Sequence, residues 1–331
     1  MLEEIENILK EWGPQIEKEI ENSIPKKGVP GINDVVWYHI GTGGKRLRPV
    51  LAIMTGKALG CDVEKILPFA AACEVLHNWL LVHDDIQDGD EVRRGQPAVW
   101  KKYGLDHGIN VGDFMSEKVY ELILKSLERG VDEKTTIKLL DEIVKTSLRT
   151  AEGQAMEFEL RKNNKPTEEE YIRMVVHKTA HYLTAPMVGA VVVANATQET
   201  IDKIREFGMK IGPAFQISDD LLDLTTGKGR EDIGSDIREG KRSMMVVHCA
   251  NNCSPEEKNQ LFDILNKPRN ETTKEDVLSV KNLFEKTGSM SYSQEQANKY
   301  MQESKDVISD MPDELRQLLE NFAEYIVNRQ R

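Results

Sequence analysis

Two aspartate-rich clusters, each at the end of an apolar segment with helical periodicity, constrain this chain more than any other feature. The first is Asp84-Asp85-Ile86-Gln87-Asp88, and the second is Asp219-Asp220-Leu221-Leu222-Asp223. In a helix, residues i and i+4 lie on one face about one turn apart, so each cluster presents two neighbouring carboxylates. Carboxylates this close repel one another unless a cation lies between them or one of them takes up a proton. We therefore expect long helices that carry two acidic sites.

A divalent metal ion is the cation that best suits these sites. Mg²⁺ prefers oxygen ligands and commonly completes its shell with water and the oxygens of a substrate phosphate. One cluster alone would be weak evidence, because 30% of the residues are charged and a solvated helix end would also explain it. A second copy with the same spacing, again behind an apolar run, is harder to explain in that way. The pair predicts a diphosphate held by metal between two helices.

Basic residues accompany both clusters although the formal net charge of the chain is −12. Arginine binds phosphate as a two-pronged donor and lysine as a point charge, and paired glycines let the backbone come close to an anion. Any one of these residues could be an ordinary surface charge, so their placement beside the clusters carries the argument. The basic segments are Gly43-Gly44-Lys45-Arg46-Leu47-Arg48-Pro49, Arg93-Arg94-Gly95, Lys178-Thr179 and Lys241-Arg242.

The rest of the chain has a helical pattern. Apolar residues recur at spacings of three and four, and no Pro/Gly/Ser-rich linker or short repeat interrupts them. An all-helical chain of 331 residues can form one domain, so a single all-α domain over residues 1–331 is expected. The glycine-rich stretch 225–240 is expected to be a mobile loop over the site, with a plain connector as the alternative. The helical segments are 65–83, 110–128, 135–160, 199–222 and 312–326.

Composition excludes several classes of function. The acidic net charge argues against nucleic acid as a partner. No run of 18 apolar residues is present, which argues against a membrane span, and the acidic start of the chain is unlike a signal peptide. A cytoplasmic location is expected, with four cysteines as free thiols. His248-Cys249 with Cys253 has too few ligands for a convincing zinc site.

In this order, the motifs resemble those of the trans-isoprenyl diphosphate synthases, or polyprenyl synthetases, and most of all the archaeal-type geranylgeranyl diphosphate synthases. The stretch 226–230 indicates the archaeal branch. The resemblance implies an all-α fold of the isoprenoid synthase type, a single large helical bundle with a central active-site cavity. The matched segments are 43–49, 74–77, 83–88, 93–95, 112–113, 153–154, 178–180, 215–223 and 234–241.

The resemblance also implies a Mg²⁺-dependent prenyltransferase that joins isopentenyl diphosphate head to tail with an allylic diphosphate. Metal ions and cations stabilise the charge on the departing diphosphate, the allylic cation is attacked by the double bond of isopentenyl diphosphate, and a proton is lost to the departing diphosphate. No side-chain nucleophile is required. The residues implied as catalytic are Asp84, Asp85, Asp88, Asp219, Asp220, Asp223 and Lys178.

Ligand roles follow from the same resemblance. The implied metal ligands are Asp84, Asp88 and Asp219, while the remaining aspartates act through water or hydrogen bonds. The implied allylic diphosphate ligands are Arg93, Lys178, Thr179, Gln216, Lys241 and Lys228. The implied isopentenyl diphosphate ligands are Lys45, Arg48, His77 and Arg94. His77 lies two turns before Asp84 on nearly the same helix face, which favours this role over that of a core histidine.

Product length depends on the residues below the first cluster. Trp79 lies about 7.5 Å below Asp84 along the helix axis, and in archaeal-type geranylgeranyl synthases an aromatic residue here limits the product to C20. An ideal helical wheel places Trp79 about 140° from Asp84 and Leu80 only about 40° away. Leu80, Leu76 and Cys73 are therefore alternative lining residues. A C20 product is expected, with a C15/C20 mixture or C25 as alternatives.

Two departures from the family pattern stand out. Glu231-Asp232 lies where many members have a lysine, so that Lys228 or Arg230 would supply the charge, and Glu157 lies where many have aspartate. A class I terpene cyclase would be expected to have a different second metal motif and to lack Lys45 and Arg48. A non-catalytic partner subunit would be expected to have lost one cluster. The family also implies a homodimer.

Overall fold

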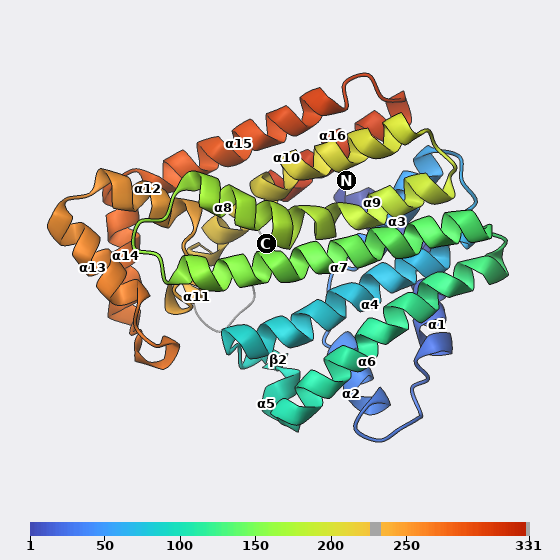
Figure 1. Ribbon diagram of the computed structural model, residues 1–331, viewed down its shortest axis with the longest axis horizontal. Coiled ribbons are helices and arrows are strands. Elements are labelled where there is room, and N and C mark those ends of the chain that lie inside the picture. Colours follow the sequence, from blue (N-terminus) through green and yellow to red (C-terminus); the bar gives the residue numbers. More distant parts are fainter. Residues whose placement is uncertain (226–232, 329–331) are drawn as a thin grey trace. The chain divides into compact units, whose positions relative to one another are not determined.

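The computed structural model describes residues 1–225 and 233–328. Their secondary structure is helical apart from one short antiparallel hairpin, in which β1 (Val92–Arg93) pairs with β2 (Gln96–Pro97) (Figure 1). This confirms the all-α class predicted from sequence. Of the five segments with helical periodicity, 65–83, 135–160 and 199–222 each lie within one α-helix. The segment 110–128 runs from α6 (Leu105–Leu124) into a 3-10 helix (Lys125–Arg129), and 312–326 begins one residue before α16 (Asp313–Asn328). Residues 42–46 connect two helices.

The described residues form two compact units. Unit 1 comprises Met1–Lys145, Thr184–Arg205 and Asp310–Asn321. Unit 2 comprises Thr146–Leu183, Glu206–Ser309 and the residues from Phe322 onward. The two aspartate clusters lie in different units, the first in unit 1 and the second in unit 2. Each unit is described by itself below.

Unit 1 is built around α4 (Val63–Asp88), the helix that ends in the first cluster. Asp62 caps its start by accepting the backbone N–H of Glu64 at 3.1 Å, and Gly89, in the left-handed region with φ 69°, ends it. Helix α4 packs against α3 and along α6 (Figure 1). Elements that begin in unit 1 are α1 (Leu2–Ser23), α2 (Asn33–Gly41), α3 (Leu47–Ala58), α5 (Val99–Tyr103), α6 (Leu105–Leu124), α7 (Glu133–Arg161), α10 (Gln198–Asp223) and α16 (Asp313–Asn328).

Helix α4 is apolar on nearly all sides because it is the core of unit 1. Ile66, Phe69, Val75 and Val82 are each at most 1% exposed. Among the described residues, α4 is the one helix long and apolar enough to cross a membrane, yet 72% of its most apolar window is buried inside the protein. A helix that is hydrophobic all round is typical of a protein core as well as of a membrane span, and this burial fits the core of a globular unit.

Unit 2 carries the second cluster at the end of α10. An apolar core lies among α12 (Met244–Asn252), α13 (Pro255–Leu265) and α14 (Lys274–Lys286), and it includes Phe262, Val280, Phe284, Met245 and Leu261. Elements that begin in unit 2 are α8 (Glu168–Val175), α9 (His181–Val193), α11 (Ser235–Arg238), α12 (Met244–Asn252), α13 (Pro255–Leu265), α14 (Lys274–Lys286) and α15 (Ser289–Val307).

A five-residue π-helical turn, Val176–Ala180, joins α8 to α9 and carries Lys178 and Thr179. Two glycines allow it to pack closely. A Cβ atom on Gly153 of α7 would lie 2.2 Å from the backbone nitrogen of Lys178, and one on Gly212 of α10 would lie 2.4 Å from the Cβ atom of Ala180. Real Cβ contacts are never this short, so the turn depends on glycine at both places. π turns of this kind are frequent at functional sites.

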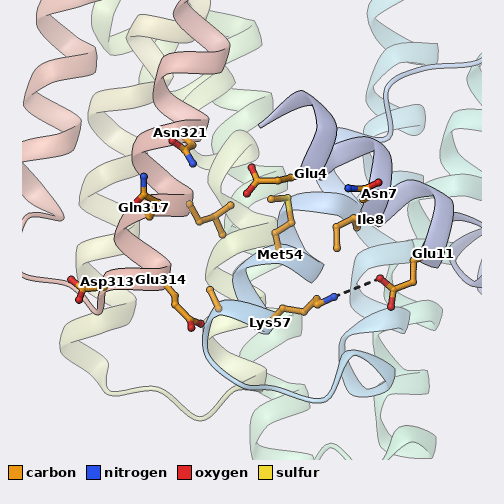
Figure 2. A pocket seen from close by; sticks show the side chains of 12 residues that line it. Glu4, Asn7, Ile8, Glu11, Met54, Lys57, Asp313, Glu314, Gln317 and Asn321 are labelled. Atoms are coloured by element: carbon orange, nitrogen blue, oxygen red, sulfur yellow. Dashed lines mark ion pairs between the residues drawn. The ribbon is translucent and has the colours of Figure 1, made fainter.

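A cavity of about 550 Å³ lies in unit 1 among α1, α3 and α16 (Figure 2). Its walls include the apolar side chains of Ile8, Met54 and Leu318, and Glu11 at its rim pairs with Lys57 at 3.6 Å. No residue implicated by the sequence in substrate or metal binding lines this cavity. The predicted chemistry must therefore be sought at the two clusters.

Candidate functional site

In the first cluster, the middle aspartate, Asp85, forms an ion pair with Arg93. Asp84 is half-buried, whereas Asp85 and Asp88 are 0% and 6% exposed. The β1–β2 hairpin returns the chain so that Arg93 reaches Asp85, donating from Nε at 2.7 Å and also from Nη2. Burial raises the pKa of Asp85 to about 6, even though Arg93 acts in the opposite direction. Asp85 therefore holds Arg93 in place at the end of α4.

A pocket of positive charge surrounds His77 in unit 1. Burial lowers the pKa of His77 well below its ordinary value. The other groups that lower it are, in order, Arg48, Arg94, His39 and Arg93. A neutral imidazole adds no positive charge of its own to the guanidinium groups that act on it. The structure thus brings together three of the four residues predicted to bind isopentenyl diphosphate.

The glycine loop before α3 is shaped around two arginines. Arg94 donates from Nη1 to the carbonyl oxygen of Gly43, and a Cβ atom on Gly44 would lie 2.8 Å from the Arg94 guanidinium. Arg46, with a positive φ of 46°, pairs through Nη1 with Glu74 at 2.5 Å. Asn78 donates to the same carboxylate at 2.8 Å. Arg46 and Glu74 therefore fix the loop on α4.

The role of Glu74 was missed by sequence reasoning, although a signal was present. Glu74 is a single carboxylate inside a long apolar stretch, and it is 1% exposed. A buried carboxylate requires a cationic or hydrogen-bonding partner, so its position alone indicates a structural ion pair. The sequence could not say that the partner is Arg46, 28 positions away.

In the second cluster, Asp220 is the buried member, at 5% exposure. Its Oδ1 accepts the Nε2–H of Gln216 and its Oδ2 accepts the O–H of Tyr171, each at 2.9 Å. Burial raises the pKa of Tyr171 well above its ordinary value, and Asp220 raises it further, so the phenol is a donor at any working pH. The Oε1 of Gln216 in turn accepts the hydroxyl of Thr179 at 2.9 Å.

Asp223 and Asp219 have different surroundings from Asp220. Asp223 is fully buried and its Oδ2 accepts the backbone N–H of Asp236 at 3.0 Å, while its carbonyl oxygen accepts the N–H of Gly234. Asp223 thereby fixes the start of α11 to the end of α10. Asp219 is half-buried, as Asp84 is in the first cluster. Both clusters thus combine a half-exposed first aspartate with a buried second aspartate that accepts hydrogen bonds from the protein.

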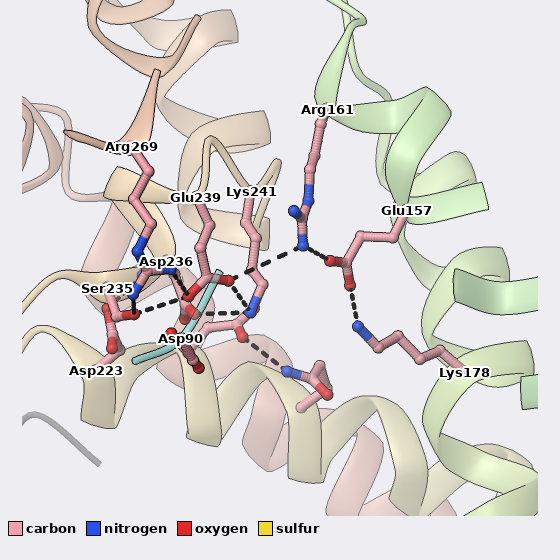
Figure 3. A network of polar contacts seen from close by, with 12 residues as sticks. Asp90, Glu157, Arg161, Lys178, Asp223, Ser235, Asp236, Glu239, Lys241 and Arg269 are labelled. Atoms are coloured by element: carbon pink, nitrogen blue, oxygen red, sulfur yellow. Dashed lines mark hydrogen bonds and ion pairs between the residues drawn. The ribbon is translucent and has the colours of Figure 1, made fainter. Parts of the chain in front are cut away.

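The predicted diphosphate-binding lysines of unit 2 are held by buried carboxylates (Figure 3). Lys178 pairs with Glu157 at 2.7 Å, and Lys241 pairs with Glu239 at 2.7 Å and Asp236 at 3.1 Å. Burial raises the pKa of Glu157, but three cations around it outweigh burial and hold that pKa below its usual range; they are Lys178, Lys241 and Arg161. Both lysines therefore converge on one carboxylate.

Glu239 is a second carboxylate at the centre of this network, with a side chain that is 0% exposed. Besides Lys241 it pairs with Arg269 at 3.0 Å and lies 3.9 Å from Arg161 (Figure 3). Sequence reasoning gave Glu239 no role, because the cations that surround it come from three separate parts of the chain. A cavity of about 20 Å³ beside the network is lined by residues that include Glu157, Tyr171, Lys178, Gln216, Asp220 and Lys241.

The residues expected to limit product length occupy different environments. Trp79 is half-buried and donates its indole N–H to Nδ1 of His83 at 3.3 Å. His83 lies against α6, with Nε2 3.3 Å from the carbonyl oxygen of Ile109. The pair therefore lies on the side of α4 that meets α6. The other candidates are Leu80, which is half-buried, and Leu76 and Cys73, which are each 1% exposed.

Some of the predicted site falls outside the described residues. Lys228 and Arg230, the two candidates for a cation over the site, belong to residues 226–232, as do Glu231 and Asp232. Of the stretch 225–240 that was expected to be a loop, residues 226–232 lie outside the described residues and Ser235–Arg238 form helix α11. These assignments stay predictions.

The chemistry of the donor sets fits a hard divalent cation. Both clusters offer carboxylate oxygens only, and Oδ2 of Asp85 is buried without a hydrogen-bond partner. In the part of the chain that the structure describes, no three His, Cys, Asp or Glu side chains are grouped so as to hold a metal ion. Each cluster would thus contribute part of a shell completed by water and phosphate oxygens, as Mg²⁺ commonly requires.

Comparison with known proteins agrees with these features. Residues 29–284 match the polyprenyl synthetase family. The chain belongs to this family. It is 33% identical to the geranylgeranyl diphosphate synthase of Methanosarcina mazei, an alignment that covers 100% of this chain and 99% of that protein.

Solved structures of the family share the fold. A geranylgeranyl pyrophosphate synthetase from Pyrococcus horikoshii superposes with a TM-score of 0.89 at 32% identity, covering 99% of both chains. A polyprenyl synthase from Caulobacter crescentus, solved in complex with calcium and isoprenyl diphosphate, also gives a TM-score of 0.89, at 25% identity, covering 100% of this chain and 98% of that one. The predicted isoprenoid synthase fold is therefore confirmed.

A pH dependence of stability follows from His39, which is 1% exposed. Burial, followed by the charges of Arg94, Arg93 and Arg46, lowers the pKa of His39 to about 3. The unfolded chain takes up a proton here as the pH falls below about 6.5 and the folded chain does not, so stability falls with pH down to about 3. Between pH 7 and pH 5 this residue should cost about 2 kcal/mol of unfolding free energy. Urea denaturation of the native chain and of His39→Gln at both pH values measures the difference.

The same substitution at His107, which is exposed, controls for the loss of an imidazole. We expect His39→Gln to lose about 2 kcal/mol less than the native chain on acidification. Equal losses in the native chain and in His39→Gln would show that His39 is protonated in the folded protein at pH 5.

Proposed function

We propose that this protein is a Mg²⁺-dependent prenyltransferase that condenses isopentenyl diphosphate head to tail with an allylic diphosphate, with geranylgeranyl diphosphate (C20) as product. The observation that carries the proposal is that a family match over most of the chain retains both aspartate clusters and the basic residues beside each of them. A cyclase would be expected to lack Lys45 and Arg48, and a non-catalytic subunit would be expected to lack one cluster.

The allylic diphosphate is proposed to bind at the two clusters. Asp84, Asp88 and Asp219 would hold Mg²⁺, which supplies electrostatic stabilisation of the charge that develops on the departing diphosphate. Lys178 and Lys241 contribute positive charge to the same diphosphate. Their ion pairs with Glu157 and Glu239 restrict the positions of the two ammonium groups before substrate arrives, which lowers the cost of organising the site.

The remaining aspartates are proposed to act through hydrogen bonds. Asp85 orients Arg93 towards the diphosphate. Asp220 orients Gln216, and Asp223 fixes the start of α11. This division of roles is supported by the hydrogen bonds that each of the three carboxylates accepts from the protein.

Isopentenyl diphosphate is proposed to bind at the positive pocket of unit 1. Arg48, Arg94 and Lys45 supply charge, and neutral His77 donates one hydrogen bond. The double bond attacks the allylic cation, and the proton that is then lost goes to the departing diphosphate. No side-chain nucleophile takes part, in keeping with a site whose polar groups are cations, carboxylates and amides.

The chain is also proposed to act as one domain, in the cytoplasm, as a homodimer. Large apolar side chains are exposed on α6 and α7, among them Leu105, Ile109, Ile137 and Val144, and a second copy of the chain would cover them. Ile137→Asp should weaken the dimer. Sedimentation equilibrium at micromolar concentration measures this, and a monomeric native chain would contradict the proposal.

The metal-binding roles predict the effect of removing single carboxylates. Asp84→Ala and Asp219→Ala should each lower turnover by about a hundredfold or more, because the charge on the departing diphosphate loses its main stabilisation. Exposed Asp141→Ala, on α7, should leave turnover unchanged. The assay measures incorporation of labelled isopentenyl diphosphate with Mg²⁺, and circular dichroism checks the fold. Near-normal turnover of either site variant would contradict the two-cluster site.

Product length tests both the reaction and the role of Trp79. The native chain, given Mg²⁺, isopentenyl diphosphate and dimethylallyl, geranyl or farnesyl diphosphate, should form a C20 product, sized as the dephosphorylated alcohol. Trp79→Ala should lengthen the product because the side chain next to α6 becomes small. Trp37→Ala, on α2, removes an indole that donates to the carbonyl of Ile24 and should not lengthen it.

The outcomes separate three possibilities. A C20 product that is unchanged in Trp79→Ala would keep the enzyme and place the floor of the tunnel at Leu80 or another lining residue. A C15/C20 mixture or a C25 product from the native chain would correct the proposed product alone. Absence of elongation with every primer would discard the proposed function and favour a cyclase or a non-catalytic subunit.

A further inference from the structure

We propose that Tyr171 is a positioning residue for the second aspartate cluster, acting through the hydrogen bond that its O–H donates to Asp220. The inference rests on the proposed function and adds to it a residue that no sequence motif indicated. It concerns unit 2 alone, where α8, α10 and the π turn Val176–Ala180 meet.

The first step is the placement of the phenol. Helix α8 begins with a capping box in which Thr167 and Glu170 satisfy each other's backbone N–H groups, and this fixes the register of Tyr171 one residue later. Tyr171 is 1% exposed, and its O–H points to Oδ2 of Asp220 at 2.9 Å. The phenol has no solvent to turn towards, so the contact with Asp220 is a fixed feature of the fold.

The second step is the orientation of Gln216. Asp220 accepts from Tyr171 on one oxygen and from Nε2 of Gln216 on the other, at 2.9 Å. Because the amide nitrogen of Gln216 donates to a carboxylate, its Oε1 must face the opposite way, where it accepts the hydroxyl of Thr179 at 2.9 Å. Three hydrogen bonds therefore link Tyr171 to the π turn, with Tyr171 and Gln216 both donating to Asp220 and Thr179 donating to Gln216.

The third step connects these hydrogen bonds to the residues proposed to bind the diphosphate. Thr179 is adjacent to Lys178, and the π turn that carries both residues is packed against Gly153 and Gly212. The glycines define how close the turn lies to α7 and α10, and the Thr179–Gln216 bond defines its register along α10. The amide of Gln216 and the ammonium group of Lys178 are thus placed together.

Loss of the phenol oxygen would disturb both Asp220 and Gln216 in this series of hydrogen bonds. In Tyr171→Phe, Oδ2 of Asp220 loses the Tyr171 donor while it remains buried near Asp219 and Asp236, which also act on this position electrostatically. Without the Tyr171 donor, the carboxylate is free to rotate, and rotation releases the amide of Gln216. A hydrogen bond to a charged group is among the stronger hydrogen bonds in proteins, so a loss of about tenfold in diphosphate affinity is expected.

The chain offers a matched control. Tyr292 on α15, also in unit 2, donates its O–H to Glu168 at 2.7 Å. Tyr292→Phe removes the same atom and the same kind of bond, a tyrosine O–H to a carboxylate, and Glu168 belongs to neither cluster. A general cost of losing such a bond would therefore appear in both variants.

The experiment compares the native chain, Tyr171→Phe and Tyr292→Phe. Calorimetric titration of inorganic diphosphate in the presence of Mg²⁺ gives a binding constant that does not depend on turnover, and steady-state assays give KM for each substrate. We expect Tyr171→Phe to weaken diphosphate binding and raise KM for the allylic substrate about tenfold, with KM for isopentenyl diphosphate unchanged. Tyr292→Phe should match the native chain in all three quantities.

Asp220→Asn completes the test. If Tyr171 acts through Asp220, adding Tyr171→Phe to Asp220→Asn should change diphosphate binding by less than about twofold. If Tyr171→Phe does not fold, Asp220→Asn alone should still weaken diphosphate binding about tenfold, because the amide of residue 220 no longer fixes Gln216 in one orientation.

Three results would overturn the inference. One is equal diphosphate affinity in Tyr171→Phe and Tyr292→Phe. Another is an equal rise of both KM values with a lowered unfolding midpoint, which would mean that the phenol only supports the fold. The third is native affinity in Asp220→Asn. A native chain that elongates no primer would instead overturn the proposed function, so the two failures are distinguishable.

Discussion

The rest of this structure depends on how buried carboxylates are compensated. Two aspartate clusters end long helices, and a buried negative charge is costly unless cations or hydrogen-bond donors surround it. The protein supplies these in an ordered way. Asp85 receives Arg93, Asp220 receives a phenol and an amide, and Asp223 receives a backbone N–H. In each cluster the first aspartate remains half-exposed. Exposure therefore distinguishes the first aspartate of each cluster from the buried second aspartate.

The lysines of unit 2 are likewise compensated, in their case by buried carboxylates. Lys178 and Lys241, the two lysines of unit 2 that we propose meet the diphosphate, both pair with glutamates whose side chains are buried. Such pairs are weak sources of stability because desolvation offsets much of the attraction. Their value here is geometric, since a flexible lysine side chain is restricted to one position. The surroundings of His77 differ, because there burial and the charges of nearby arginines keep the imidazole neutral.

Much of this arrangement could be predicted from sequence because it is local. Helical periodicity located five segments that are largely helical, and the i, i+1, i+4 spacing identified both clusters. The contacts that organise the clusters could not be predicted, because they join distant positions. Tyr171 is 49 residues from Asp220, and Arg46 is 28 residues from Glu74. The glycines at 153 and 212 were visible in the sequence, but only the packing shows that each faces the π turn.

The π turn between α8 and α9 has a consequence for how this chain can vary. A π turn holds one residue more than the equivalent α-helical path, at a cost in hydrogen-bond geometry. Deleting a single residue from Val176–Ala180 would allow an unbroken and locally more stable helix from α8 into α9. It would also remove the wide turn that carries Lys178 and Thr179 against Gly153 and Gly212. Helix regularity and the placement of these two side chains therefore make opposite demands on the length of this segment.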